Sequence, residues 1–76
     1  QAIAHHEQAF AYTGNKRFLE INLSLMLAIR TAFAESGESE KAAEVLAQAE
    51  RYAQKYGLQD CFAKLCVRHV REESGN

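Results

Sequence analysis

The side chains that could do chemistry begin with two imidazoles and a carboxylate in a row, His5, His6 and Glu7. Neighbouring residues on an α-helix point about 100° apart, so the two imidazoles cannot face one ion as the i, i+4 pair of a zinc-binding helix does. We therefore interpret His5 as solvated and His6 as half-buried. The sequence predicts no metal site at this position and no cofactor.

Cys61 and Cys66 are the two cysteines, and they lie five residues apart. On a helix this spacing turns their side chains about 140° apart, so we do not expect them to bridge each other. We interpret them as small core residues of a protein in a reducing compartment such as the cytoplasm, with a redox or intermolecular disulfide or a metal site as the alternatives. His69 falls on one face with Leu65, Cys66 and Val70, so we expect a core or interface histidine rather than a ligand paired with Cys66.

Catalysis would need a nucleophile next to a base, or two carboxylates that face each other across a cleft. The candidate carboxylates are expected at a turn or on exposed helix faces, and they are Glu35, Glu38, Glu40, Glu44 and Glu50. Such a charge pattern is typical of a solvated surface. We expect no enzyme activity.

The composition predicts an all-α protein of one small domain. Among 76 residues there is no proline and there are four glycines, while the residue types that favour helices are abundant. The formal net charge is -1 and no basic block is present, so neither nucleic acid nor an anionic membrane surface is an expected partner. No run approaches the ~20 apolar residues that span a bilayer. The start at Gln1 rather than at methionine suggests a processed product or a piece cut from a longer protein.

Apolar residues at helical spacing predict four helices, over about residues 2–13, 17–35, 39–56 and 58–73. Gly14 and Gly57 are the expected ends of the first and third helices, because glycine adopts the left-handed conformation that terminates a helix. The stretch Glu35-Ser36-Gly37-Glu38 predicts a tight turn between the second and third helices. Connections this short allow only antiparallel packing of successive helices.

The second predicted helix is apolar nearly all round, which indicates that neighbours cover it on more than one side. We expect it to be the central helix. The third and fourth helices have narrower apolar stripes. The residues expected to be buried are Ala42, Val45, Leu46, Ala49, Tyr52 and either Ala53 or Tyr56 in the third helix, and Leu58, Phe62, Leu65, Cys66, His69 and Val70 in the fourth.

The sequence is similar to itself when it is shifted by forty residues. The shift pairs Ala2 with Ala42, Gln8 with Gln48, Ala9 with Ala49, Tyr12 with Tyr52, Leu25 with Leu65, Phe18 with Leu58, Met26 with Cys66 and Leu27 with Val67. It also places helix on helix and turn on turn. Self-similarity at a fixed period of this size is the pattern of a repeat protein.

These features resemble the tetratricopeptide repeat in a longer form of roughly forty residues. The positions that match its motif are Met26, Ile29, Arg30, Phe33, Ala42, Leu46 and Ala49, and the stretch 2–9 looks like the second helix of such a repeat. The resemblance implies a fragment of a right-handed superhelix, with the four helices as the second, first, second and first members of successive pairs. Arg30 and Val70 depart from it, since the family has glycine or alanine there, and the usual proline is absent near Gly57.

The resemblance implies a non-catalytic scaffold for protein–protein interaction, as in the repeat regions of bacterial regulators and adaptors. The first helices of such pairs line the concave side, and the implied groove would bind an amphipathic or acidic peptide. Its residues would be Ser24, Leu27, Thr31, Glu35, Lys64, Val67 and Arg71. The lysine and asparagine set that clamps a terminal carboxylate in some members is absent at Leu27, Ala28 and Thr31, so we do not expect that ligand. In the alternative interpretation these residues only pack against adjacent repeats.

A helix missing before Ala2 would leave Ile3, His6 and Phe10 partly uncovered, so we expect self-association through the first helix. The alternative is a complete, dimeric four-helix bundle that acts as a small regulator or chaperone. That alternative predicts four helices closed around one core.

Overall fold

The computed structural model describes the backbone of residues 2–73 and the side chains of residues 2–68. The regular structure in this range is helical throughout: α1 (Ala2–Thr13), α2 (Arg17–Glu35), α3 (Ser39–Tyr56) and α4 (Gln59–Glu73). This confirms the all-α class. The bounds of the first three helices coincide with those that periodicity predicts, and α4 begins one residue later than predicted.

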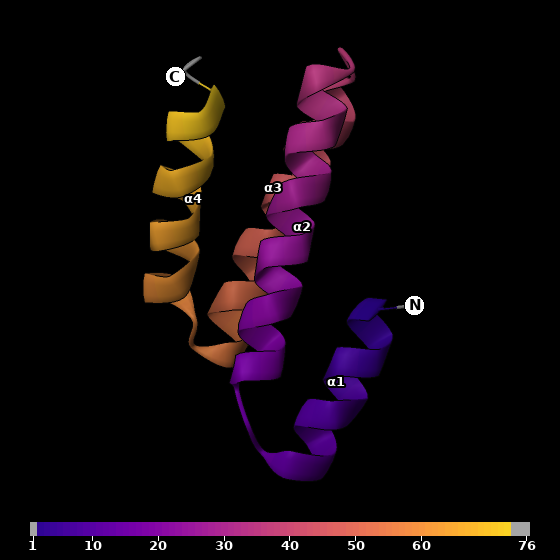
Figure 1. The fold of residues 1–76 in the computed structure, drawn as a ribbon, viewed down its shortest axis with the longest axis vertical. Helices are drawn as coiled ribbons and strands as arrows, with labels where there is room; N and C mark the ends of the chain where they lie inside the picture. The colour runs from indigo at the N-terminus through magenta and orange to yellow at the C-terminus, as the bar shows by residue number, and fades with distance from the viewer. Residues whose placement is uncertain (1, 74–76) are drawn as a thin grey trace.

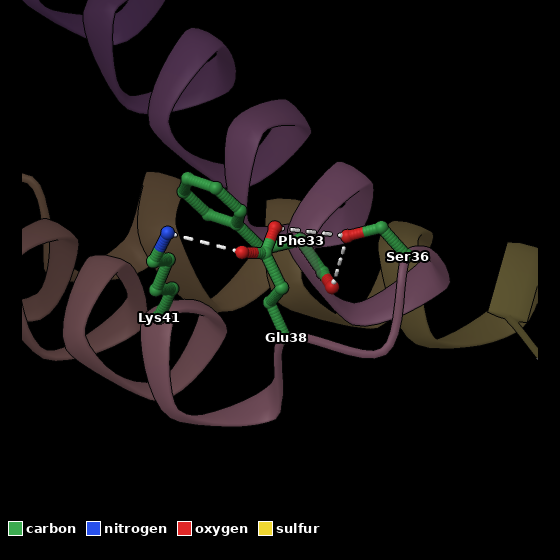
Figure 2. A network of polar contacts seen from close by, with 4 residues as sticks. All are labelled: Phe33, Ser36, Glu38 and Lys41. Atoms are coloured by element: carbon green, nitrogen blue, oxygen red, sulfur yellow. Dashed lines mark hydrogen bonds and ion pairs between the residues drawn. The ribbon is translucent and has the colours of Figure 1, made fainter.

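The turn between α2 and α3 is built from backbone and side-chain contacts (Figure 2). The Ser36 hydroxyl donates to the Phe33 carbonyl at 3.0 Å and lies 3.2 Å from a carboxylate oxygen of Glu38. The other oxygen of Glu38 is 3.0 Å from Lys41 Nζ, and this ammonium lies 5.7 Å from the centre of the Phe33 ring. Because Gly37 has a φ of 85°, it supplies the left-handed conformation that reverses the chain here.

The chain also reverses direction at Gly57, which caps α3. Its φ is 70° and its backbone N–H donates to the Ala53 carbonyl, while the Leu58 N–H donates to the same carbonyl at 2.7 Å. This is the expected glycine cap of a helix. It places Leu58 against the core, where its side chain is 6% exposed.

The core lies mainly between α2 and α3. Three leucines of α2 are buried on one face, and small side chains of α3 meet them. The core cluster consists of Leu19, Leu23, Leu27, Ala49, Ala53 and Leu58. Alanines at this contact let the two helix backbones approach closely, so leucines from one side alone fill the space.

Leu46 is a correction to the predicted core. Its side chain is 37% exposed and lies outside the core cluster. Ala42, Ala49 and Ala53 form the line of α3 that meets α2, and Leu46 lies beside this line, where no described helix covers it fully. Periodicity places a residue on a face of its own helix, but it does not show how far the neighbouring helix extends.

The four helices do not close into a ring (Figure 1). α2 contacts all three other helices, which confirms it as the central helix, while α1 and α4 lie on opposite sides of it and make no contact in the described part of the chain. α2 and α4 run in the same direction and α1 and α3 in the opposite one. A bundle closed around one core would bring α1 against α4, so the structure departs from that arrangement.

Candidate functional site

An open cleft lies between α2 and α4. The part lined mainly by α2 has a volume of about 380 Å³. An adjoining part, lined mainly by α4, has a volume of about 390 Å³. Both parts share Glu20, Cys61 and Leu65. We call this surface the α2–α4 cleft, and its residues are Arg17, Glu20, Ile21 and Ser24 from α2 with Asp60, Cys61, Lys64, Leu65 and Arg68 from α4.

The cleft has an apolar floor and charged rims. Ile21 is 38% exposed, and Cys61 and Leu65 are half-buried beside it. On the α4 rim, Lys64 and Arg68 are one helical turn apart and both are exposed, so they present two positive charges in a row. Neither makes an ion pair among the described residues. The arrangement can hold an apolar side chain next to acidic groups.

The surroundings of the two cysteines disfavour their thiolate forms. Both cysteines are free and half-buried. Burial raises the pKa of the Cys61 thiol, and Glu20 raises it further while Lys64 opposes the change. Burial likewise raises the pKa of the Cys66 thiol, against the effect of Arg30. Since the thiolate is the reactive form, these shifts lower the reactivity of both thiols at neutral pH.

These shifts predict that stability falls in alkaline solution. Burial also raises the pKa of Tyr52 above its ordinary 10.0, and those of Cys61 and Cys66 lie above 9.0. A group whose pKa is raised by folding stabilises the fold fully below its unfolded pKa, and this contribution is lost as the pH rises through the folded value. We expect the free energy of unfolding in urea to fall as the pH rises above about 9. Replacing both cysteines with alanine should remove the part of this decrease that begins at the lowest pH. A free energy of unfolding that stays constant as the pH rises above about 9 would contradict the prediction.

Of the residues predicted for the groove, Ser24 and Lys64 line the α2–α4 cleft. Leu27 is a correction, because it is 1% exposed and belongs to the core between α2 and α3. Thr31 is half-buried and its hydroxyl donates to the Leu27 carbonyl at 3.0 Å. Glu35 is exposed and Val67 is 56% exposed, but neither lines the cleft. The side chain of Arg71 lies outside the described residues.

Sequence reasoning missed most of the residues that line the cleft. Arg17, Ile21 and Ser24 follow each other at steps of four and three on α2, as Cys61, Leu65 and Arg68 do on α4. Such spacing is a signal that could have identified a shared face. The cleft lies nearer the beginning of α2 than the resemblance implied. The way in which two helices pack against each other is a tertiary property, which periodicity does not contain.

The residues predicted for self-association face the rest of the chain. His6 Nδ1 is 2.9 Å from Asn22 Oδ1, and the Phe10 ring lies edge-on to the Tyr56 ring with centres 6.0 Å apart. The side chain of Ile3 borders an apolar pocket of about 260 Å³, which Ala2, Leu25 and Ile29 also line. His6 and Phe10 therefore make contacts within the chain, and since they and Ile3 are only half-buried, self-association through this face stays a prediction.

A buried asparagine joins α1, α2 and α3. Asn22 is 0% exposed, and its side-chain amide donates to the Ile3 carbonyl at 3.1 Å and to the Tyr52 hydroxyl at 3.0 Å. Its oxygen carries no proton, so the proton of its bond with His6 belongs to His6 Nδ1. Among the described residues no buried side-chain polar atom is left without a partner. A polar residue between Ile21 and Leu23 gave no signal of this role in the sequence.

His5 and His6 have the exposure that their spacing predicts, with His5 exposed and His6 half-buried, while the side chain of His69 lies outside the described residues. Among residues 2–68, whose side chains the structure describes, no three His, Cys, Asp or Glu side chains gather where they could hold a metal ion. None of the described helices is long and apolar enough to cross a membrane.

Comparison with known proteins returns no relative. No family model, no curated protein and no solved structure matches the chain. The likeness to the tetratricopeptide repeat therefore rests on the residues of this sequence alone.

Proposed function

We propose that this chain is a non-catalytic scaffold of tetratricopeptide type that binds a protein partner in the α2–α4 cleft. The observation that carries the proposal is the cleft itself, whose floor of Ile21, Cys61 and Leu65 is flanked by charged side chains on both helices. The part of the cleft that is lined mainly by α2 has a volume of about 380 Å³, which falls within the usual range for ligand sites.

The arrangement of the helices supports this type of scaffold. Successive helices run antiparallel, α2 and α4 run side by side in the same direction, and α1 and α4 lie on opposite sides of α2. An array of helical pairs has these relations, because each unit contacts only its neighbours along the array. The repeat regions of regulators and adaptors use such arrays to present a surface to a protein.

The α2–α4 cleft has a small excess of positive charge, since Arg17, Lys64 and Arg68 outnumber Glu20 and Asp60, and this excess favours a partner segment with acidic groups. Lys64 and Arg68 are exposed on one rim and can pair with two carboxylates spaced a helical turn apart. The apolar floor suits one or two aliphatic side chains of the same segment. An acidic amphipathic segment of a protein in the same reducing compartment is the partner that we propose, and binding it requires no cofactor, nucleic acid or membrane.

Site-specific photo-crosslinking in the source cell tests the proposal. A photoreactive residue in place of Ser24 should form a defined crosslink to a partner. When the variant also carries Lys64→Glu and Arg68→Glu, the yield of this crosslink should be at least tenfold lower. The control is the same photoreactive residue in place of Gln48, which lies on the exposed face of α3. Equal crosslinks from both positions, or yields unaffected by the charge reversal, would contradict binding in the cleft.

A further inference from the structure

The charges of the α2–α4 cleft are separated along its length. α2 and α4 are in contact and run in the same direction, so the first turns of both helices lie at one end of the cleft (Figure 1). Glu20 and Asp60 are the acidic residues of these first turns. Asp60, Lys64 and Arg68 follow each other at steps of four on α4, which places Arg68 about 12 Å beyond Asp60 along the helix axis.

The repeat places the two acidic residues at equivalent positions. With the shift of forty residues, Glu20 corresponds to Asp60. Ile21 of the cleft floor corresponds in the same way to Cys61. Both helices therefore line the cleft in the same order, with an acidic residue followed by a floor residue. One turn further on, α4 has Lys64 where α2 has an uncharged residue, so α4 alone adds positive charge beyond the floor.

Charged groups from both helices act on the floor of the cleft. Burial has the largest effect on the pKa of the Cys61 thiol and raises it, while Glu20 raises it further and Lys64 lowers it. The charged side chains of the cleft are exposed and form no ion pairs with one another among the described residues, and they are Arg17, Glu20, Asp60, Lys64 and Arg68. Their charges are therefore available to a partner.

The two ends of the cleft differ in charge. We call the end at Arg17, Glu20 and Asp60 the acidic end, and the end at Lys64 and Arg68 the basic end. At the acidic end the guanidinium offsets one of the two carboxylates, whereas the basic end has two positive charges and no carboxylate. The positive ends of the helix dipoles weaken the negative charge at the acidic end, but the difference between the two ends remains.

We propose that the α2–α4 cleft selects a helical segment whose acidic residues lie on one side of its apolar anchor and whose basic residue lies on the other side. The acidic residues pair with Lys64 and Arg68 at the basic end, and the basic residue pairs with Glu20 and Asp60 at the acidic end. This inference rests on the proposed function and adds to it the charge order of the partner.

Glu20 and Asp60 are therefore specificity-determining residues. A segment with acidic residues on both sides of its anchor places like charges against each other at the acidic end, which weakens its binding. A segment with basic residues on both sides meets the same repulsion at the basic end. The cleft thus rejects two kinds of amphipathic segment that its apolar floor alone would accept.

Three synthetic helices with the same central leucines test the charge order. The mixed helix has glutamates on one side of the leucines and a lysine on the other, the acidic helix has glutamates on both sides, and the basic helix has lysines on both sides. Fluorescence anisotropy of each labelled helix with the full chain at low ionic strength measures the affinities. The mixed helix should bind about fivefold more tightly than the acidic helix, and the basic helix should bind most weakly.

Reversing the acidic end should change this order. In the variant with Glu20→Lys and Asp60→Lys, the acidic helix should become the tightest ligand. The matched control is Glu40→Lys with Glu44→Lys, which makes the same change of charge on exposed residues of α3, one of them also in a first helical turn. The control should keep the order of the wild type, and circular dichroism should show that both variants are folded. Glu20→Gln with Asp60→Asn removes the repulsion with less change, and it should bind the acidic helix more tightly than the wild type does.

The outcomes separate the charge order from binding itself. Equal affinities for the mixed and acidic helices, or an acidic helix that gains nothing from either change at Glu20 and Asp60, would overturn the charge order and leave binding in the cleft intact. If none of the three helices bound, the proposed function would fail and the charge order with it.

Discussion

Leu23→Ala should cost about 3–5 kcal/mol of the free energy of unfolding. Leu23 is 0% exposed and lies in the middle of the leucine face of α2, against the alanines of α3. The neighbouring alanines have no side-chain length with which to fill the space, so the substitution leaves a cavity in addition to the lost transfer energy. For a chain of 76 residues the whole stability is about 4–11 kcal/mol, so the substitution should remove between about a quarter of the stability and all of it.

The matched control is Leu46→Ala, because it removes the same atoms from a side chain that is 37% exposed. We expect it to cost less, about 1–2 kcal/mol, since more than a third of the Leu46 surface already lies in water and the lost atoms leave no enclosed cavity. Urea unfolding followed by circular dichroism in dilute solution measures both values. If the two variants lost equal stability, the core would not lie between α2 and α3 as described.

Asn22→Leu should destabilise the chain by about 2 kcal/mol, although it places an apolar residue of similar size in the core. Leucine would leave the Ile3 carbonyl, the Tyr52 hydroxyl and His6 Nδ1 without their partner. An unsatisfied polar group costs more than a hydrogen bond contributes, because the group has left water without compensation. The loss should appear first as faster amide hydrogen exchange in α1, because the asparagine connects that helix to α2 and α3.

Tyr52→Phe tests the hydrogen bonds around Asn22 separately from the packing of the Tyr52 ring. It removes one partner of Asn22 and keeps the ring that contacts Tyr56 at 4.9 Å between ring centres. We expect it to cost about 1 kcal/mol, and the double variant with Asn22→Leu should cost less than the sum of the two single changes. An Asn22→Leu variant that is more stable than the wild type would show that this network does not hold α1 in place.

The sequence was sufficient to predict where the helices begin and end. Glycine marks each of the three connections, and the apolar spacing fixes which face of each helix is buried. The alanine line of α3 and the central place of α2 also follow from the pattern. These features are local, or they depend on a period that each helix carries by itself.

The features that the sequence did not reveal depend on how the helices meet. Asn22 is a polar residue in an apolar helix, and only the approach of Ile3 and Tyr52 gives it partners. Leu27 was expected in a groove and is buried, because α3 covers the part of α2 that the resemblance assigned to the concave side. The α2–α4 cleft depends on how these two helices pack together, and side chains from both line it.

Self-association through Ile3, His6 and Phe10 stays a prediction. Periodicity placed these residues on one face of α1, and the structure turns that face toward the rest of the chain, where His6 meets Asn22 and Phe10 meets Tyr56. All three side chains are half-buried, so the contacts within the chain leave part of this face uncovered.

The most direct test of the proposed function is an amide chemical-shift titration of the labelled chain. The probe is a synthetic helix with a leucine stripe flanked by glutamates, and its control is the same helix flanked by lysines. We expect the acidic helix to shift the amide signals of Ile21, Ser24, Leu65 and Arg68. The basic helix should bind with at least tenfold lower affinity in the same titration. Equal shifts from the two helices, or shifts confined to the exposed face of α3, would contradict binding of an acidic segment in the α2–α4 cleft.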